Sequence, residues 1–233
     1  PDIDGDGKVD LLTDKLGYLG VSLGGIMGPE LLALSSDIDA AILSVPGGKV
    51  SSIIQSSKQF GPLIYAFKPE GTSDGDVDRF FAVLQTLLDA GDAASYAPYV
   101  LKARIRGPKD HAPHLLIQMA IGDDIVPNVA TRNLARGLGI PIVAPVVQPI
   151  STLVAAPTVP FSNNVAGVTA GLFQFDRVRD HAKAPVQASD HSGTPASYEA
   201  FAQDSAFLSP WLAGNAPQII DPYAELQTPP LKN

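Results

Sequence analysis

The sequence predicts an α/β fold in which helices cover both faces of a mostly parallel sheet. Three apolar runs of strand length, residues 16–21, 40–45 and 115–121, are each followed by a glycine-containing turn. The first two runs flank an apolar helical segment at residues 26–34, and this strand–helix–strand order is typical of parallel sheets. Because the strands are continuously apolar rather than alternating, we expect both faces of the sheet to be buried.

The composition excludes several classes of protein. The chain has 233 residues, of which 45% are hydrophobic and 17% charged, so it can bury a sizeable core and is not disordered. Its formal net charge of −8 leaves no basic stripe for nucleic acid. The absence of cysteine excludes thiolate nucleophiles and cysteine-ligated zinc. No apolar run reaches the ~20 residues of a transmembrane helix.

The first predicted helix contains a proline. Residues 26–34 are apolar on most faces, which indicates a buried helix. Pro29 lies inside it and removes the backbone bond to Gly25, so we expect a kink there.

Residues 49–112 interrupt the strand–helix rhythm and predict a helical cap inserted into the core. Their apolar clusters indicate two or three helices separated by polar turns. A cap of this kind could line a substrate pocket, and Tyr65, Phe80 and Tyr96 are its candidate contact residues. The alternative is that these helices simply pack on the sheet.

The strand–helix rhythm resumes at residues 115–121. Asn128 is a candidate N-cap for a helix over 129–136, and Gly137 follows at the position where helices often end. The five prolines within residues 140–160 exclude a helix or a central strand and predict a long ordered loop.

The chain ends with one more strand and one more helix. Residues 168–175 form the last candidate strand, and residues 196–213 form the last candidate helix. Phe201, Phe207 and Trp211 are expected on or near one side of that helix.

A candidate nucleophile lies between the first strand and the first helix. Residues 20–24 read Gly-Val-Ser-Leu-Gly, the G-x-S-x-G pattern, in the strand–turn–helix context that the motif requires. On such a turn the hydroxyl of Ser22 is exposed at the carboxyl end of the sheet. The helix N-terminus behind it favours negative charge, and the Leu23 N–H is placed to bind an oxyanion. The alternative is a glycine-rich turn without chemistry.

A nucleophilic serine needs a base and an orienting acid. Asp123 and Asp124 follow the strand 115–121, at the sheet edge where catalytic groups gather in this class of fold. Either of them could instead be an ordinary turn residue.

The sequence contains four histidines. His111 and His114 precede the strand 115–121 and are expected at the wrong end of the sheet. His181 and His191 both follow the last strand, and His191 lies in the loop shortly before the last helix. We therefore predict His191 as the base, with His181 as the alternative that could instead pair with a neighbouring aspartate.

The motifs carry a family resemblance. Residues 18–25, 41–48 and 121–128 resemble the C-terminal part of an α/β-hydrolase and, within that superfamily, bacterial extracellular lipases and esterases. The last segment resembles the family's acid loop, in which the aspartate that precedes x-V-P by two residues is catalytic, and this selects Asp123. The resemblance spans most of residues 11–215.

The resemblance implies a serine carboxylic-ester hydrolase with the triad Ser22, Asp123 and His191, which forms an acyl-enzyme and needs no organic cofactor. A lipid or small-molecule ester is the implied substrate. A polyester hydrolase, a thioesterase and a peptidase are alternatives on the same fold. A non-catalytic binding module is the alternative of another class.

The position of the elbow departs from the family pattern. In relatives, several strands and the loop that provides the second oxyanion donor come before the nucleophile, whereas here the serine is already residue 22. We therefore expect a C-terminal fragment whose apolar sheet edge is covered by an N-terminal segment, in a separate chain or lost. The predicted domains are an acidic loop at 1–14, a hydrolase core at 15–48 and 113–233, and the cap at 49–112.

The acidic loop is a candidate calcium site. Asp2, Asp4, Asp6 and Asp10 alternate along it, and Ca²⁺ prefers such oxygen ligands. The match to an EF-hand is incomplete because Thr13 takes the place of the final glutamate. The loop resembles the shorter calcium loops of secreted proteins. Such a structural ion would suit a secreted, periplasmic or outer-surface bacterial protein.

Overall fold

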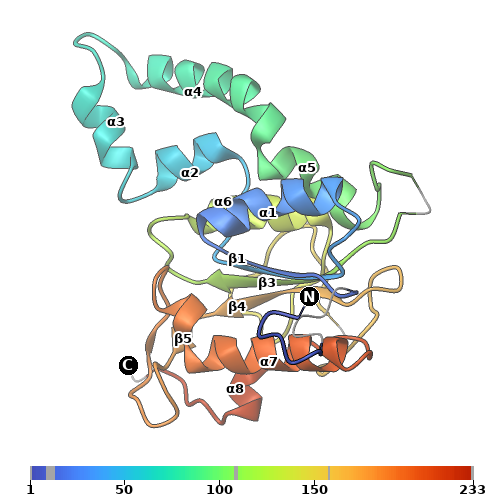
Figure 1. The fold of residues 1–233 in the computed structure, drawn as a ribbon. Coiled ribbons are helices and arrows are strands. Elements are labelled where there is room, and N and C mark those ends of the chain that lie inside the picture. The colour runs from blue at the N-terminus through green and yellow to red at the C-terminus, as the bar shows by residue number, and fades with distance from the viewer. Residues whose placement is uncertain (1, 9–13, 108–109, 157, 232–233) are drawn as a thin grey trace.

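The computed structural model describes residues 2–8, 14–107, 110–156 and 158–231. At its centre lies a four-stranded parallel sheet (Figure 1). The strands in spatial order are β1 (Gly17–Val21), β2 (Ala40–Ser44), β3 (His114–Ala120) and β4 (Ala170–Phe175). The predicted α/β fold with a parallel sheet is confirmed.

Helices cover both faces of the sheet. The helices α1 (Leu23–Leu34), α5 (Ala93–Leu101) and α6 (Asn128–Leu138) lie on one face. The helix α7 (Tyr198–Leu212), followed by α8 (Pro222–Glu225), lies on the other. The two layers lie on opposite sides of the sheet in Figure 1.

Alternate residues of β2, β3 and β4 enter different cores. Leu115 and Ile117 of β3 join the core beneath α1, α5 and α6. Leu116 joins the opposite core, where Phe173 and Phe207 are fully buried. This two-sided burial explains why the strands read as continuous apolar runs.

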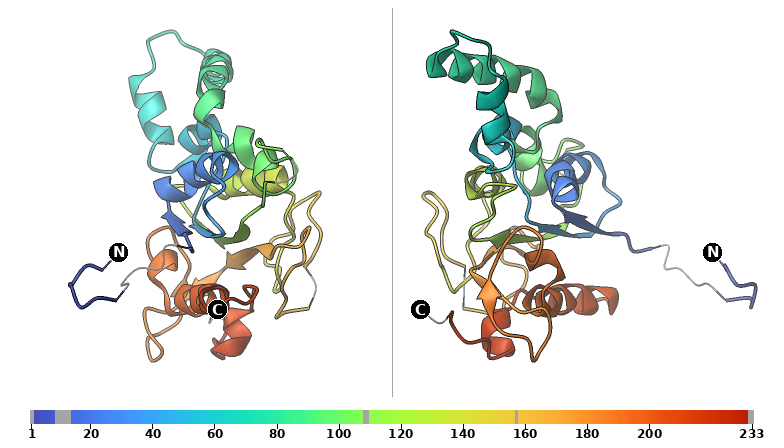
Figure 2. Two further views of the ribbon diagram at one scale, coloured as in Figure 1. Left: turned by 45° about the vertical axis from the view of Figure 1, so that its right-hand side comes forward. Right: turned by 90° about the vertical axis from the view of Figure 1, so that its left-hand side faces the viewer.

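Between β2 and β3 the described residues form four helices, rather than the two or three expected. They are α2 (Val50–Ser56), α3 (Gly61–Phe67), α4 (Asp74–Leu88) and α5, with a short 3₁₀ turn η1 (Asp89–Gly91) before α5. Figures 1 and 2 show α3 and α4 projecting away from the sheet. By contrast, α5 packs against α1 and α6.

A buried aspartate joins the projecting helices to the body. The Asp92 carboxylate accepts hydrogen bonds from the backbone N–H groups of Lys49, Val50 and Ala94 and from the Gln85 side chain. Burial alone raises the pKa of Asp92, but these donors outweigh it and hold the pKa below its usual value. One carboxylate thus connects the starts of α2 and α5 with the end of α4.

Two helix boundaries differ from the sequence prediction. Helix α1 begins directly after Ser22 and continues past Pro29 to Leu34. Helix α6 runs through Gly137 and ends at Gly139, whose left-handed backbone (φ 62°) forms the C-cap. Gly137 instead lies against α5, because a Cβ there would come within 2.7 Å of the Ala97 side chain.

The predicted N-cap of α6 is also wrong. The cap position is Pro127, and Asn128 is the first helical residue. The Asn128 side chain turns back into the preceding loop, where it donates to the Ala120 carbonyl (2.6 Å) and accepts from the Gly122 N–H (3.2 Å). It therefore closes the loop that carries Asp123.

The remaining segments surround the last strand and helix. Residues 140–156 contain no regular helix or strand, as the prolines predict, and an isolated bridge joins Ile142 to Leu172 of β4. A small hairpin of β5 (Arg177–Val178) and β6 (Gln187–Ala188) and a 3₁₀ turn η2 (Thr194–Ala196) precede α7. Along α7, Phe207 is buried whereas Phe201 is exposed.

Strand β1 forms an open edge of the sheet. Among the described residues, no strand pairs with its outer side. The bonds from Ser22 N to Ser44 O and from Asp39 N to Leu16 O direct the even-numbered positions toward β2. The backbone groups of Leu19 and Val21 consequently face outward.

No helix in the described part of the chain is long and apolar enough to cross a membrane.

Asp204 gives the fold a pH-dependent stability. It lies on α7 and accepts a hydrogen bond from Gln118 of β3 (2.8 Å), and burial raises its pKa to about 7. An unfolded aspartate has a pKa of about 3.9. Between pH 4 and 7 the unfolded chain therefore ionises while the folded chain keeps its proton, and the free energy of unfolding falls as pH rises.

We expect Asp204→Asn to raise the free energy of unfolding by about 4 kcal/mol at pH 8 and by almost nothing at pH 4. The amide cannot ionise but can still accept from Gln118. Urea denaturation at the two pH values measures the difference. An equal effect at both would show that Asp204 is not protonated in the folded protein.

Candidate active site

Ser22 occupies a strained turn between β1 and α1. Its backbone angles are φ 54° and ψ −113°, outside the regions that L-residues ordinarily adopt. Its N–H donates to the Ser44 carbonyl of β2 (3.0 Å), and its carbonyl accepts from the Ile26 N–H (2.9 Å). The sheet on one side and the helix on the other hold this conformation, as in a nucleophile elbow.

Two neighbouring glycines differ in the space they leave at the turn. A Cβ on Gly20 would lie 2.6 Å from both the Gly24 carbonyl oxygen and the Tyr18 ring. A Cβ on Gly24 would meet only the Tyr18 hydroxyl, at 3.6 Å. That hydroxyl donates to the Gly24 carbonyl (2.7 Å) and closes the turn. Of these two positions, Gly20 is therefore the one whose contacts leave no room for a side chain.

The structure brings Ser22, Asp123 and His191 together at the carboxyl edge of the sheet. His191 Nε2 lies 2.8 Å from Ser22 Oγ, and His191 Nδ1 lies 2.8 Å and 3.0 Å from the two carboxylate oxygens of Asp123. Both Asp123 and His191 are buried, at 8% exposure each. Water therefore competes little with these bonds.

The acid loop fixes the orientation of Asp123. Its Oδ1 also accepts from the N–H groups of Ile125 (3.0 Å) and Val126 (2.8 Å). Asp124 has a different place, because its backbone carbonyl accepts from Lys58 N–H and Ser57 Oγ, in the segment between α2 and α3. Of the two aspartates, Asp123 is the one that contacts the imidazole.

These bonds define the tautomer of His191. A carboxylate can only accept, so Nδ1 carries the proton and Nε2 presents a lone pair to the Ser22 hydroxyl. The arrangement suits removal of a proton from Ser22. His181 lies elsewhere: it is exposed, and its Nδ1 accepts from the Lys183 N–H.

Leu23 is the first residue of α1, and its side chain is exposed. Its N–H belongs to the first turn of the helix, where backbone donors have no intrahelical partner and the helix dipole is positive. It is thus placed to donate to an anion beside Ser22.

The predicted substrate contacts lie on different helices. Tyr65 of α3 and Phe80 of α4 are exposed on the projecting arm. Phe80 lines a largely apolar cavity of about 480 Å³ together with Ile64, Phe67 and Phe81. Tyr96 of α5 packs on the main core, and its hydroxyl donates to the Ala90 carbonyl (2.6 Å).

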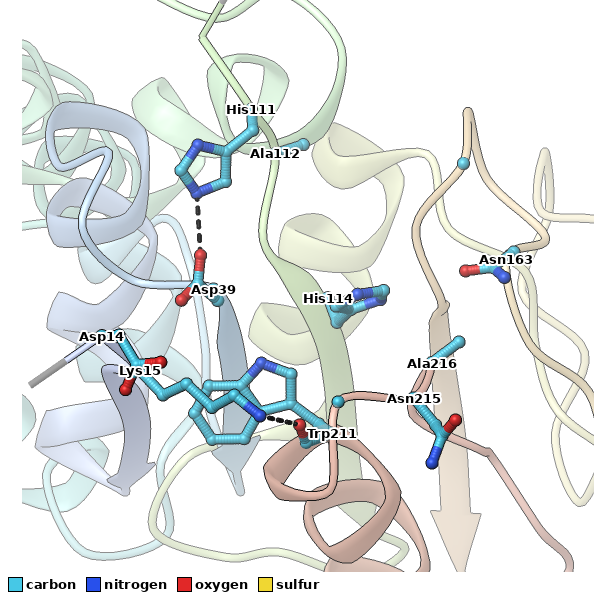
Figure 3. Close-up of a pocket in the computed structure, with 12 residues that line it drawn as sticks. Asp14, Lys15, Asp39, His111, Ala112, His114, Asn163, Trp211, Asn215 and Ala216 are labelled. Carbon is cyan, nitrogen blue, oxygen red and sulfur yellow. Dashed lines mark hydrogen bonds and ion pairs between the residues drawn. The ribbon is translucent and has the colours of Figure 1, made fainter. Parts of the chain in front are cut away.

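A second cavity, of about 520 Å³, lies at the opposite edge of the sheet (Figure 3). His111 and His114 line it, which places both histidines at the amino ends of the strands. His111 Nε2 contacts Asp39 (3.0 Å), and His114 Nδ1 accepts from the Thr169 N–H (2.9 Å). Burial lowers the pKa of His114. These side chains are already partnered by the protein.

The acidic loop brings three predicted ligands together. Carboxylate oxygens of Asp2, Asp4 and Asp6 lie within 4.8 Å of one another. Asp2 also accepts from the Gly5 and Gly7 N–H groups (2.7 and 2.9 Å), which curls the loop. The fourth predicted ligand, Asp10, lies outside the described residues.

Sequence patterns missed two residues that support the site. Asn128 closes the acid loop, although its sequence position indicated a helix cap. The Ser189 hydroxyl contacts the carbonyls of Ile121 and Phe175, and no local motif marks it.

The parallel sheet with helices on both faces, and the serine at a strand-to-helix turn, match an α/β-hydrolase-like fold. No protein-family model matches the sequence, and neither does any curated protein.

Comparison with solved structures finds distant similarities. An acylaminoacyl peptidase in complex with Z-Gly-Gly-Phe-chloromethyl ketone is 13% identical, with a TM-score of 0.46 over 88% of this chain and 24% of its own. The uncomplexed acylaminoacyl peptidase of Pyrococcus horikoshii is 14% identical, with a TM-score of 0.44 over 82% of this chain and 24% of its own.

A puromycin-hydrolysing peptidase of Mycobacterium tuberculosis is 18% identical, with a TM-score of 0.34 over 53% of this chain and 16% of its own. The chain thus spans about a quarter or less of the length of these structures.

Proposed function

We propose that the protein is a serine hydrolase that acts on carboxylic esters through an acyl-enzyme. One observation carries the proposal: an unbroken hydrogen-bond chain runs from Asp123 through His191 to Ser22. The serine lies on a strained turn at a helix N-terminus, so a base, an orienting acid and an anion-stabilising group surround one hydroxyl.

The proposed reaction has two halves. Ser22 Oγ attacks the acyl carbonyl carbon while its proton moves to His191 Nε2, and the Leu23 N–H donates to the resulting oxyanion. The carbon–alkoxide bond then breaks, and His191 returns the proton to the departing alcohol. A water then attacks the acyl carbon while its proton moves to His191. The bond from the acyl carbon to Ser22 Oγ breaks, and His191 returns the proton to Ser22 as the carboxylic acid leaves. Asp123 stabilises the imidazolium in both halves.

The exposed apolar side chains of the projecting helices α3 and α4 support an ester with an apolar acyl chain as the substrate. Tyr65 and Phe80 are its proposed contact residues, because their rings are exposed on α3 and α4. Tyr96 is the weaker candidate, since its hydroxyl is already bonded. A panel of chromogenic esters of increasing acyl length, together with thioesters, polyesters and peptides, distinguishes the proposal from the other hydrolases of this fold.

The open edge of β1 supports a further partner. An exposed apolar stripe on α1 consists of Leu23, Met27, Leu31 and Leu34, and Leu19 and Val21 of β1 are exposed as well. We propose that an additional polypeptide segment, such as an N-terminal segment of the same protein, pairs in parallel with β1. Its carboxyl end would then lie beside Ser22 and could provide a second donor to the oxyanion.

The acidic loop supports a structural calcium site, which suits a secreted, periplasmic or outer-surface protein. Because three carboxylates already converge, we expect titration calorimetry to detect Ca²⁺ binding that a chelator reverses. Asp4→Asn should weaken this binding about tenfold or more, a loss of ~1.4 kcal/mol. Asp37→Asn, on an exposed turn before β2, is the control. Equal binding by both variants would contradict the site.

The proposed function predicts covalent labelling by a fluorophosphonate probe, which traps an activated serine. Peptide mass spectrometry should find the adduct on Ser22, and the variants Ser22→Ala and His191→Ala should lose it. Ser192→Ala, an exposed serine beside the base, should label like the wild type. Failure of the wild-type protein to label in the presence of the segment proposed to pair with β1 would favour a binding module that retains the fold.

A further inference from the structure

Ser189 links the segment that carries His191 to the ends of two strands. Its side chain is nearly inaccessible, at 4% exposure, and its Oγ lies 2.9 Å from the Ile121 carbonyl oxygen and 2.5 Å from the Phe175 carbonyl oxygen. Phe175 is the last residue of β4, and Ile121 directly follows β3. The hydroxyl proton is shared between two acceptors whose positions are set by the sheet.

The sequence positions of these contacts relate them to the active site. Ser189 lies two residues before His191, and Ile121 lies two residues before Asp123. The strand ends are themselves joined, because the Ile121 N–H donates to the Phe175 carbonyl (2.7 Å). The Ser189 hydroxyl therefore joins the segment that carries His191 to the segment that carries Asp123. It does so two residues before each of these side chains, close to the hydrogen bond between them.

The other bonds near His191 do not reach β3. Asp190 Oδ1 accepts from the N–H groups of Ser192 (2.9 Å) and Gly193 (2.6 Å), which closes the turn locally. The Ser189 N–H donates to the Asp176 carbonyl (3.1 Å), which continues the small hairpin after β4. The position of residues 189–191 relative to the acid loop consequently depends on the Ser189 side chain.

We propose that Ser189 is a positioning residue that sets the separation and orientation of the His191 imidazole relative to Asp123. The inference rests on the proposed hydrolase function for its kinetic consequence, although the geometric claim stands independently of it. Without the hydroxyl, the His191–Asp123 bond would be the remaining side-chain hydrogen bond, among the described residues, from residues 189–191 to the acid loop. A displacement of about 1 Å at a reacting group can cost on the order of 10²-fold in rate.

The test compares Ser189→Ala with Ser189→Thr, which keeps a hydroxyl, and with Ser192→Ala, which removes an exposed hydroxyl on the other side of His191. We expect Ser189→Ala to lower kcat about 10- to 100-fold while KM changes little. The downfield proton resonance of His191 Nδ1–H should weaken or shift. Ser192→Ala should match the wild type, and Ser189→Thr should recover most of the rate.

Two measurements distinguish a loss of His191 positioning from a loss of folding of the variant and from failure of the proposed hydrolase function. Circular dichroism and urea denaturation establish that each variant is folded under assay conditions. An unchanged Nδ1–H resonance and a kcat within twofold of wild type in folded Ser189→Ala would overturn the inference. If the wild-type protein shows no activity or labelling, the hydrolase proposal fails. In that case the resonance alone decides whether Ser189 positions His191.

Discussion

Asp123→Asn is expected to lower kcat by about 10³- to 10⁴-fold with the fold intact. An asparagine has nearly the same shape, and its oxygen can still accept from Ile125 and Val126. Its amide nitrogen, however, can donate to His191 Nδ1 and so stabilise the tautomer with the proton on Nε2. That tautomer cannot accept the proton of Ser22. The side chain would also no longer balance the charge of the imidazolium.

Asp124→Asn is the matched control because the two aspartates are adjacent in the acid loop. Asp124 contacts its surroundings through its backbone carbonyl, which the substitution keeps. We therefore expect its kcat to stay within about twofold of the wild type. Steady-state kinetics on a chromogenic ester and the rate of fluorophosphonate labelling measure both variants. Similar losses in the two variants would remove Asp123 from its proposed role.

Gly20→Ala is expected to destabilise the protein by about 2–3 kcal/mol or to prevent its folding, and to abolish labelling of Ser22. The new methyl group would lie 2.6 Å from the Gly24 carbonyl oxygen, which is backbone and cannot rotate away. Relief would require α1 to move from β1, and this movement would displace the strained turn that presents Ser22.

Gly24→Ala is the control for the same motif. Its methyl group would meet the Tyr18 hydroxyl at 3.6 Å, an ordinary contact, and alanine favours a helix over glycine by up to ~1 kcal/mol. We expect this variant to be as stable as the wild type or slightly more so. Urea denaturation and labelling compare the pair. If both variants fold and label normally, close packing at Gly20 does not support the elbow.

Local sequence patterns identified the elements and most of the site. The runs that became β2 and β3 are apolar because both faces of the sheet are covered there, whereas Leu19 and Val21 of the apolar run that became β1 are exposed at the open edge. The position of Ser22 followed from a strand–turn–helix pattern whose steric demands act between near neighbours. The choice of His191 over His111 and His114 followed from parallel topology, which places them at opposite sheet edges.

The same local rules failed where a long-range contact competes with them. Asn128 looks like a helix cap, but its amide closes the acid loop because Ala120 and Gly122 offer it two partners. Gly137 looks like a helix end, yet it lies mid-helix because α5 packs against it, and Gly139 ends the helix instead.

By itself, the sequence predicted the α/β class and, with the family resemblance, the three side chains that the structure brings together at the carboxyl edge of the sheet. Only the tertiary structure decided that α3 and α4 project from the body and that Ser189 joins the two loops. The physical reason is distance along the chain. The bonds from His191 to Asp123 and to Ser22 span 68 and 169 residues, so their geometry depends on how whole layers pack, which no local pattern specifies.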